Sequence, residues 1–244
     1  LITRKEQGQI RYYTVLGTGN FNEDTATIFA DHLLFTYDQE FGHDAAEIAR
    51  FFRRSYQPPK LKHIISAPFY LRTFLREKIE REIANHNEGL SSGISIKVNN
   101  FSDSETNELI HRAAAAGVPV RLIVRSMFSM VLEKDSPIQA ISIVDKYLEH
   151  SRMFWFKNDG DDEVYLSSAD FLPRNFDSRV ETVFPIFAAR LKAQLEECFD
   201  IQWNDNTKAR ILDHDLTNAY QERREGEPRR RAQFEIENYL REEN

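Results

Sequence analysis

The sequence is poor in features that mark several common protein classes. Among its 244 residues there is one cysteine, Cys198, which excludes a disulfide framework and a cysteine-based metal site. No apolar run approaches the length of a membrane span, and no signal peptide is visible. An excess of positive charge is also missing, because the formal net charge is −7, which argues against general binding of nucleic acid. We therefore expect a cytoplasmic protein in which only local basic clusters bind anions.

The domain organisation is indicated by one break in the pattern. Apolar residues make up 41% of the chain, enough for a sizeable core in one large domain or two modest ones. Two consecutive prolines at 58–59 end a predicted helix over 38–56, because proline cannot continue a helix. We place a domain boundary there, between 1–57 and 60–244. The chain begins with Leu1 in the middle of a predicted strand, so we expect it to be a piece of a longer protein.

The larger segment alternates predicted strands with predicted helices. The smaller segment is expected to begin with a hairpin of strands over 1–4 and 9–16. In the larger one, strands are expected over 62–67, 93–98, 118–124, 153–156, 163–166 and 178–184. Helices are expected over 70–87, 103–116, 188–199 and 232–241. The β-α-β-α-β order at its start predicts an α/β domain with right-handed crossovers.

Basic residues stand at the ends of two of these strands. Lys97 lies near the end of 93–98, and Arg125 follows 118–124. Ligands of open α/β sheets bind beyond the carboxyl ends of the strands, so both residues are candidates for an anion site. The alternative for each is a surface cation whose aliphatic stem lies along the rim of the sheet. The basic run at 228–231 is expected to be solvated or paired with acids, with an anionic polymer as the alternative partner.

The most informative stretch is 141–152, in which an apolar, β-branched strand leads to His150 and Arg152. In an extended segment, residues i and i+2 point to the same face, so these two side chains can reach one site. A histidine can be a nucleophile or a proton carrier near neutral pH, and an arginine beside it can hold phosphate oxygens. The pair therefore predicts phosphate chemistry. The alternative is a hydrogen-bonded histidine at a strand end that has no functional role.

A predicted hairpin separates this pair from a second polar group, which contains Ser168, Asp170 and Asn175. His-x-basic, a hairpin and then Ser-x-Asp is the layout of one half of a phospholipase-D-like phosphotransfer site. We expect all three residues to bind ATP or phosphate. We also expect Asp170 to orient the imidazole of His150 and to hold its proton on one nitrogen. The alternative is that these are ordinary turn residues.

The pattern of a strand followed by a small polar segment and Phe occurs twice, at 17–21 and 167–171. Such an internal repeat suggests two related half-sites. Thr18 and Asn20 thereby become candidate phosphate contacts, because the glycines around Thr18 allow the backbone to approach an anion closely. A plain tight turn is the alternative.

The spacing within this repeat predicts where the histidine equivalent to His150 lies in the first half-site. Ser168 follows His150 by 168 − 150 = 18 residues, and the same distance counted back from Thr18 gives position zero. No histidine occurs within residues 1–17. The histidine of the first half-site is therefore expected at or just before the start of this chain.

Together these motifs resemble the C-terminal half of the polyphosphate kinases that work through a phosphohistidine. The resemblance covers essentially the whole chain, and its most specific stretches are Leu16-Gly-Thr-Gly-Asn-Phe-Asn-Glu23, 31–36, 140–150 and Ser167-Ser-Ala-Asp170. It implies an α/β fold of phospholipase-D-like domains, each a mixed sheet flanked by helices, that meet around a tunnel. By this resemblance, residues 1–57 are the C-terminal part of the first catalytic domain, and residues 60–244 are the second.

In that family the terminal phosphate of ATP passes reversibly through a histidine to a growing polyphosphate chain, with Mg²⁺ as cofactor. The resemblance implies that the nucleophilic histidine and the arginines that help to hold magnesium lie upstream, so no metal ligand is assigned here. It implies that His150 acts on protons near the nucleotide phosphates and that Arg125 contacts ATP. Phe29 stands where the family has a nucleotide-contacting tyrosine. The fragment alone is expected to be inactive, and the full-length protein to be a homo-oligomer with peripheral membrane association.

Three departures from the family pattern affect the nucleotide contacts. Val15 replaces a frequent histidine, Phe29 has lost the hydroxyl of the tyrosine, and the loop 126–137 is shorter than usual. Two other functions stay open from the residues. One is a phospholipase-D-type phosphodiesterase or nuclease, which transfers to water but is disfavoured for DNA by the acidic charge. The other is a non-catalytic module that binds polyphosphate or pairs subunits.

Overall fold

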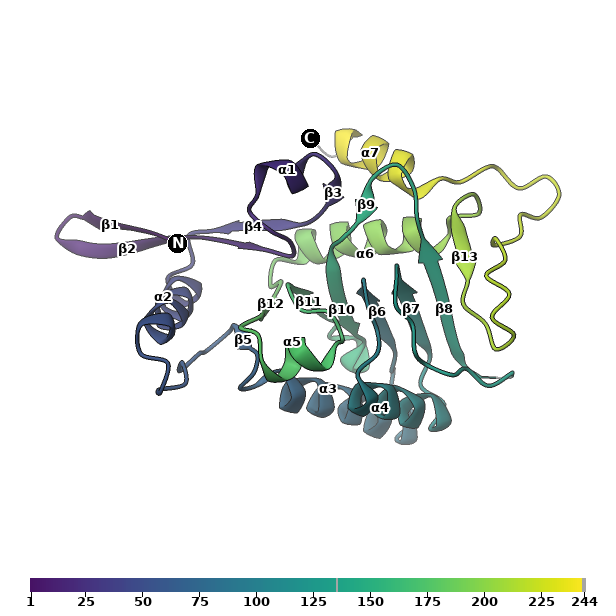
Figure 1. The fold of residues 1–244 in the computed structure, drawn as a ribbon, viewed down its shortest axis with the longest axis horizontal. Helices are drawn as coiled ribbons and strands as arrows, with labels where there is room; N and C mark the ends of the chain where they lie inside the picture. Colours follow the sequence, from purple (N-terminus) through teal and green to yellow (C-terminus); the bar gives the residue numbers. More distant parts are fainter. Residues whose placement is uncertain (135, 243–244) are drawn as a thin grey trace.

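The computed structural model describes residues 1–134 and 136–242. Asp135, which belongs to the predicted short loop 126–137, and residues 243–244 lie outside the described residues. A long N-terminal hairpin projects from one side of a layered α/β body (Figure 1). No helix among the described residues combines the length and the apolarity that a membrane crossing requires.

The N-terminal part is a three-stranded antiparallel sheet with a helix beside it. Its elements are β1 (Ile2–Glu6), β2 (Gln9–Gly17), α1 (Glu23–Ala26), β3 (Phe29–Ala30), β4 (Leu33–Thr36) and α2 (Gln39–Arg53). The predicted hairpin is confirmed, with β1 and β2 joined by Gln7 and Gly8, whose φ angles are 49° and 83°. Positive φ at both turn residues matches the twist of an antiparallel hairpin.

The main sheet has eight strands in the order β13-β8-β7-β6-β10-β11-β12-β5. Its strands are β5 (Ile65–Ser66), β6 (Ile94–Val98), β7 (Val120–Val124), β8 (Ile138–Ile143), β10 (Arg152–Phe156), β11 (Glu163–Ser167), β12 (Thr182–Pro185) and β13 (Ala209–Ile211). Strands β6, β7 and β8 are parallel, whereas the other pairs are antiparallel. The sheet is therefore mixed, as the predicted fold class requires.

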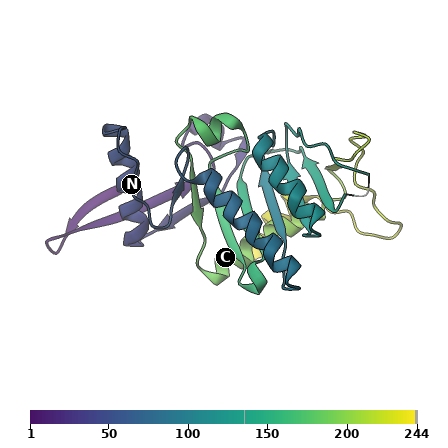
Figure 2. The same ribbon diagram turned by 90° about the horizontal axis from the view of Figure 1, so that it is seen from below.

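Helices cover both faces of this sheet. The helices α3 (Leu71–Asn87) and α4 (Ser104–Ala115) lie side by side on one face (Figure 2), and α6 (Ala189–Trp203) lies across the other (Figure 1). Alternation along β6 sends Ile94, Ile96 and Val98 into the core under α3 and α4. Ser95 and Lys97 point to the α6 side. A polar site can therefore form on the α6 side while the opposite side stays apolar.

The remaining elements are short or terminal. They are β9 (Leu148–Glu149), the 3₁₀ helix η1 (Asn158–Gly160), α5 (Pro173–Asp177) and α7 (Ala232–Glu242). Strand β9 pairs in parallel with β3, not with the main sheet. Helix α7 contacts α6, and together with Ala30 of β3 it lines one pocket.

The predicted helices are confirmed, and most strands are found where they were expected. Two strand predictions were too long, because β5 covers only two residues of 62–67 and β12 begins at Thr182. Strand β5 pairs antiparallel with β12, so the parallel run starts one strand later than predicted. The short strands β3, β4, β9 and β13 were not predicted. Their pairing partners lie far away in the sequence or at a sheet edge, and local periodicity does not reveal such pairs.

Asp44 ties α2 to the chain that leads into the main sheet. Its side chain is buried, and its carboxylate accepts the backbone N–H groups of Lys62, His63 and Ile64 at 2.9, 2.7 and 2.8 Å. A carboxylate that accepts several backbone donors fixes the path of a segment that has no regular structure of its own. The contact thus joins the two sides of the predicted boundary at 58–59.

We predict that Asp44→Ala lowers the free energy of unfolding by at least about 2 kcal/mol, because three backbone donors lose their acceptor. Urea unfolding followed by circular dichroism measures the loss. Glu108→Ala, at an exposed position of α4, is the control and should change stability by less than about 0.5 kcal/mol. Equal stability of the two variants would contradict the proposed role of Asp44.

Candidate active site

His150 sits where β9 passes into β10, and its backbone is held by β3. The carbonyl oxygen of Ala30 accepts the N–H groups of His150 and Ser151 at 3.1 and 3.0 Å. This pairing brings Phe29 and Asp31, the two neighbours of Ala30, into contact with the imidazole. His150 is 9% exposed, so its surroundings in the protein determine its chemistry.

The imidazole has one acidic and one aromatic neighbour. Its Nδ1 atom lies 2.9 and 3.1 Å from the two carboxylate oxygens of Asp31. The ring of Phe29 lies 4.5 Å from the imidazole, centroid to centroid, at an interplanar angle of 45°. A proton on Nδ1 that is donated to Asp31 leaves Nε2 as the atom that accepts or donates protons toward a substrate. This is the arrangement of a histidine oriented for acid–base chemistry.

Asp31 is itself fixed by the segment that follows β2. The hydroxyl of Thr18 donates to Asp31 Oδ1 at 2.7 Å and accepts the N–H of His32 at 3.0 Å. Burial by itself raises the pKa of Asp31, but the hydrogen bonds from His150 and Thr18 and the charge of Arg152 hold it below the ordinary value. Asp31 therefore stays an anion beside the imidazole.

Gly19 is required by the approach of the same carboxylate. A Cβ atom at Gly19 would lie 2.0 Å from Asp31 Oδ2, closer than any side chain allows. The glycines around Thr18 were predicted to let the backbone approach an anion. Within this chain, the anion that approaches Gly19 is the carboxylate of Asp31.

Arg152 joins the two halves of the site. Its Nη1 donates to the carbonyl oxygen of Thr18 at 2.6 Å and lies 3.4 Å from His150 Nδ1. Its Nε and Nη2 atoms each lie 3.2 Å from one oxygen of Asp170. Arg152 thus stands next to His150, where the i, i+2 argument predicted it.

Asp170 does not orient the imidazole, so that prediction is wrong. In addition to Arg152, its carboxylate accepts the backbone N–H of Asn99 at 2.8 Å and the side-chain N–H of Asn100 at 3.0 Å. Burial by itself raises the pKa of Asp170, but the Arg152 charge and these hydrogen bonds hold it below the ordinary value. The residue that contacts the imidazole is Asp31, which lies 119 residues from His150 in the sequence.

Arg125 lies at the carboxyl end of β7, as predicted, and is half-buried. Its Nε atom is buried, with no hydrogen-bond partner in the part of the chain that the structure describes. Burial lowers the pKa of its guanidinium, and the charges of Asp170, Arg152, Glu149 and Asp31 act on the same group. A cation with an unused donor beside this site is suited to an anionic ligand.

Asn20 and Phe29 line a cavity of about 450 Å³, and two of its lining residues, Phe29 and Asp31, contact the imidazole of His150. The cavity is bounded by the segment from Gly19 to Ala26 together with Phe29, Asp31 and Leu33. Asn20 is exposed and Phe29 half-buried, so both are accessible to a ligand in this cavity. An aromatic face and an amide side by side are suited to a base or another planar group.

Three predicted phosphate contacts are engaged by other protein groups. Lys97 is buried, and its ammonium lies 2.7 Å from Glu149 and 2.8 Å from the Ser151 hydroxyl. Ser168 and Asn175 both turn to Glu181, at 2.5 and 2.6 Å. The structure therefore brings Phe29 and Arg152 into contact with His150, and Thr18 and Asp170 into contact with Arg152, while Arg125 lies close enough to feel the charges of Arg152 and Asp170. It directs Lys97, Ser168 and Asn175 elsewhere.

Asp31 was not among the residues predicted for the site. The only signal for it was its place in the stretch 31–36, which resembles the family. No local pattern connects an aspartate after a two-residue strand with a histidine more than a hundred residues away. The basic run was interpreted correctly at one position, because Arg231 pairs with Asp145.

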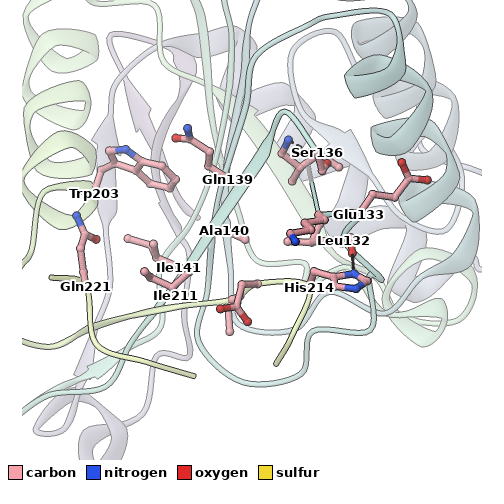
Figure 3. A pocket seen from close by; sticks show the side chains of 14 residues that line it. Leu132, Glu133, Ser136, Gln139, Ala140, Ile141, Trp203, Ile211, His214 and Gln221 are labelled. Carbon is pink, nitrogen blue, oxygen red and sulfur yellow. Dashed lines mark hydrogen bonds between the residues drawn. The ribbon is translucent and has the colours of Figure 1, made fainter. Parts of the chain in front are cut away.

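Another cavity, of about 390 Å³, lies at the far edge of the main sheet (Figure 3). Ile141, Ile211 and Trp203 form its apolar side, and His214 contacts the carbonyl oxygen of Leu132 at 2.8 Å on the other side. None of the residues predicted for phosphate chemistry lines it. The cavity lined by Asn20 and Phe29, by contrast, contains two of the residues predicted to contact ATP or phosphate.

Comparisons with known proteins agree with this geometry. The family model described as polyphosphate kinase C-terminal domain 2 matches residues 64–233, and the model described as polyphosphate kinase C-terminal domain 1 matches residues 1–58. Polyphosphate kinase of Escherichia coli strain K12 is 43% identical over 98% of this chain. That of Klebsiella pneumoniae is 40% identical over the same share. The chain spans 35% of the length of each of these relatives.

Solved structures give the same result for the fold. The crystal structure of polyphosphate kinase from Porphyromonas gingivalis superposes with a TM-score of 0.93, at 34% identity, over all of this chain and 38% of that one. A phosphatidylserine synthase from Haemophilus influenzae superposes over 88% of this chain and 62% of its own, with a TM-score of 0.52 and 14% identity. At that identity the second likeness concerns the fold alone. The predicted fold class is confirmed as an α/β fold with a mixed sheet flanked by helices.

The depressed pKa of Asp170 predicts how stability depends on pH. A folded-state pKa below the unfolded value, which is about 3.9, means that the stabilisation is complete above that value and is lost as the pH falls through the folded pKa. We therefore expect wild-type protein to be more stable than Asp170→Asn at neutral pH. The difference should shrink from about pH 5 downward. Urea midpoints measured between about pH 7 and pH 3 test this, and a gap that widens on acidification would contradict it.

Proposed function

The chain belongs to the polyphosphate kinase family, and we propose that the protein of which it is part transfers the terminal phosphate of ATP reversibly to inorganic polyphosphate. We further propose that the transfer passes through a phosphohistidine. The observation that supports this is the His150–Asp31 pair, with Arg152 against the same imidazole. Asp31 and Phe29, which both contact the imidazole, also line the cavity that contains Asn20. The site thus combines a proton carrier, phosphate-binding cations and a planar surface.

Within this proposal, residues 1–57 are the end of a first phospholipase-D-like domain and residues 60–244 are a second one. The nucleophilic histidine lies in the upstream part of the first domain. Thr18 and Asp31, from the first segment, already meet His150 and Arg152, from the second. A site made from both segments supports a mechanism in which one half-site carries the phosphoryl group and the other assists.

The proposed division of labour follows from the contacts of His150. Asp31 accepts the Nδ1 proton, which directs Nε2 to the substrate phosphates. When the upstream imidazole forms its bond to the terminal phosphorus, the bond to the ADP oxygen breaks, and negative charge develops on that oxygen. His150 donates a hydrogen bond or a proton to it, and Arg125 stabilises the equatorial oxygens. Polyphosphate then attacks the phosphohistidine, and the upstream imidazole is released.

The proposal includes Mg²⁺, which neutralises phosphate charge in such transfers. Within 1–134 and 136–242, no group of three or more histidine, cysteine or acidic side chains is placed to hold a metal ion. ADP and polyphosphate are the proposed partners of the site. A homo-oligomer, peripheral membrane association and a cytoplasmic location of the full-length protein stay predictions.

We predict that His150→Ala in the full-length protein lowers the rate of polyphosphate synthesis by about 10²–10⁴-fold, the range of general acid–base catalysis. The measurement is the growth of labelled polyphosphate from ATP with magnesium. Incubation of the variant with labelled ATP should still produce, slowly, an acid-labile phosphohistidine at an upstream residue. His150→Gln is the matched variant, because it keeps a polar side chain without the proton chemistry, and it should be equally impaired.

Several results would contradict parts of this assignment. Label on His150 itself in wild-type protein would make it the nucleophile. Full activity of His150→Ala would leave it a structural residue. Hydrolysis of phosphodiesters by the wild-type protein, without any transfer from ATP, would replace the kinase by a phosphodiesterase.

We predict that Arg125→Ala in the full-length protein reduces kcat/KM for ATP by roughly 10- to 100-fold, the value of one charge-assisted contact to phosphate. Steady-state kinetics with ATP as the varied substrate measure the change. Arg112→Ala, which removes an exposed arginine of α4, is the matched control and should leave kcat/KM within about twofold. Unchanged kinetics for Arg125→Ala would return this residue to the class of surface cations.

A further inference from the structure

The residues on both sides of His150 are anchored to one buried cation. Because side chains alternate along an extended segment, Glu149 and Ser151 point away from the imidazole. Both contact the Lys97 ammonium, at 2.7 and 2.8 Å, and all three residues are at most 5% exposed. The backbone that carries His150 is thus fixed from the side opposite to Asp31.

Glu149 has more partners than an ion pair requires. Its Oε2 accepts from Lys97 at 2.7 Å and from Gln202 at 2.8 Å, and its Oε1 accepts from Gln233 at 2.9 Å. Burial by itself raises the pKa of Glu149, but Lys97 and the two amides hold it below the ordinary value. The carboxylate is therefore a fixed anchor that lies one residue before His150.

Gln233, in the first turn of α7, also holds the loop that leads to this anchor. Its Oε1 accepts the N–H of Tyr147 at 2.9 Å, and its Nε2 donates to the carbonyl oxygen of Tyr147 at 2.8 Å. One side-chain amide thus pairs with both backbone groups of a residue, as a neighbouring strand would. The same Nε2 reaches Glu149, so Gln233 bridges two positions of the segment that ends in His150.

The loop between β8 and β9 has little else to hold it. Val144 and Tyr147 are 60% and 40% exposed, and β9 contains only two residues. A second contact from the same end of α7 supports it, because Arg231 donates from Nε to Asp145 at 2.8 Å and from Nη2 to the other oxygen of that carboxylate. The start of α7 is held in turn by Asp205, which accepts the Ala232 N–H at 2.8 Å.

We propose that Gln233 is a positioning residue for the transfer reaction, and that α7 acts through it on the segment 147–150 to hold the His150 imidazole against Asp31. The inference rests on the proposed function of His150. Lys97, which was predicted as an anion contact, belongs to the same positioning network. Gln233 itself contacts neither substrate nor the imidazole, and it acts through the backbone of the loop.

The physical reason is geometric. Proton transfer and phosphate stabilisation require the reacting nitrogen within hydrogen-bond distance of its target, and a misplacement of about 1 Å can cost about 10²-fold in rate. When Gln233 is truncated, the Tyr147 N–H and carbonyl oxygen lose their partner, and an exposed loop has no strand to replace it. The imidazole then samples positions away from Asp31, while the nucleotide cavity on the other segment stays intact.

The first test compares two glutamines in the full-length enzyme. Gln233 and Gln202 donate to the same carboxylate, but Gln233 also holds Tyr147. We expect Gln233→Ala to lower kcat at least about tenfold, with KM for ATP within about threefold, whereas Gln202→Ala keeps kcat within about threefold. Equal losses in the two variants, or a wild-type kcat for Gln233→Ala, would overturn the proposal.

A pH profile supplies a signature that a purely structural role would not produce. In Gln233→Glu the new carboxyl is half-buried within hydrogen-bond distance of Glu149, so the neighbouring negative charge should raise its pKa. The ionised carboxylate repels Glu149 and the Tyr147 carbonyl oxygen. The protonated carboxyl group accepts a hydrogen bond from the Tyr147 N–H and donates one to Glu149 or to the Tyr147 carbonyl oxygen. The rate of Gln233→Glu relative to wild type should therefore increase as the pH falls from about 8 to about 6. A ratio that does not depend on pH would count against the proposal.

Amide hydrogen exchange in the full-length protein measures how well the loop is held, without an activity assay. The peptide covering 144–151 should exchange at least about tenfold faster in Gln233→Ala than in wild type or Gln202→Ala, because Tyr147 has lost its acceptor. Unchanged exchange would overturn the inference. His150→Ala, assayed in parallel, separates the two levels: if it is impaired and Gln233→Ala is not, the positioning role alone fails. If His150→Ala is fully active, the proposed function of His150 fails first.

Discussion

The site depends on the contact between two short strands, β3 and β9. Each contains two residues, and they pair in parallel. It is the point at which the N-terminal part of the chain touches the backbone next to His150. The Ala30 carbonyl oxygen accepts two successive N–H groups there, and Phe29 and Asp31 thereby both contact one imidazole. Because so short a ladder contributes little stability by itself, the side-chain contacts around it have to maintain the register.

Those contacts are mostly buried charges in pairs. His150 lies against Asp31, Arg152 against Asp170, and Lys97 against Glu149, with every one of these side chains less than a fifth exposed. The desolvation of such pairs offsets much of their attraction, so their main contribution is not net stability. Their geometry is restrictive, because each carboxylate also accepts hydrogen bonds from a second group. The pairs therefore specify where each charge stands, which is what a site for phosphoryl transfer needs.

The sequence permitted those predictions that depend on local geometry. Strand alternation placed His150 and Arg152 together, and the rule for strand ends placed Arg125 correctly. The internal repeat identified Thr18 as a site residue, although its hydroxyl donates to Asp31 and was predicted to contact phosphate. Predictions that required a choice of partner failed. Asp170 bonds to Arg152, Lys97 pairs with Glu149, and Ser168 and Asn175 turn to Glu181. A polar residue has several candidate partners at similar cost, and only the three-dimensional packing selects one.

Three distant parts of the chain hold His150 or the residues next to it, and the need for a fixed imidazole explains why. An imidazole that exchanges protons must be accessible at one nitrogen and immobile everywhere else. Access leaves only part of its surface for packing, so the orientation has to come from its own backbone and from its other nitrogen. The N-terminal segment fixes the nitrogen through Asp31, β6 fixes the backbone through Lys97, and α7 fixes the preceding loop through Gln233. Each of these contacts comes from an element outside the chain that connects β8 to β10. That connection consists of an exposed loop and a two-residue strand, so it cannot fix the imidazole by itself.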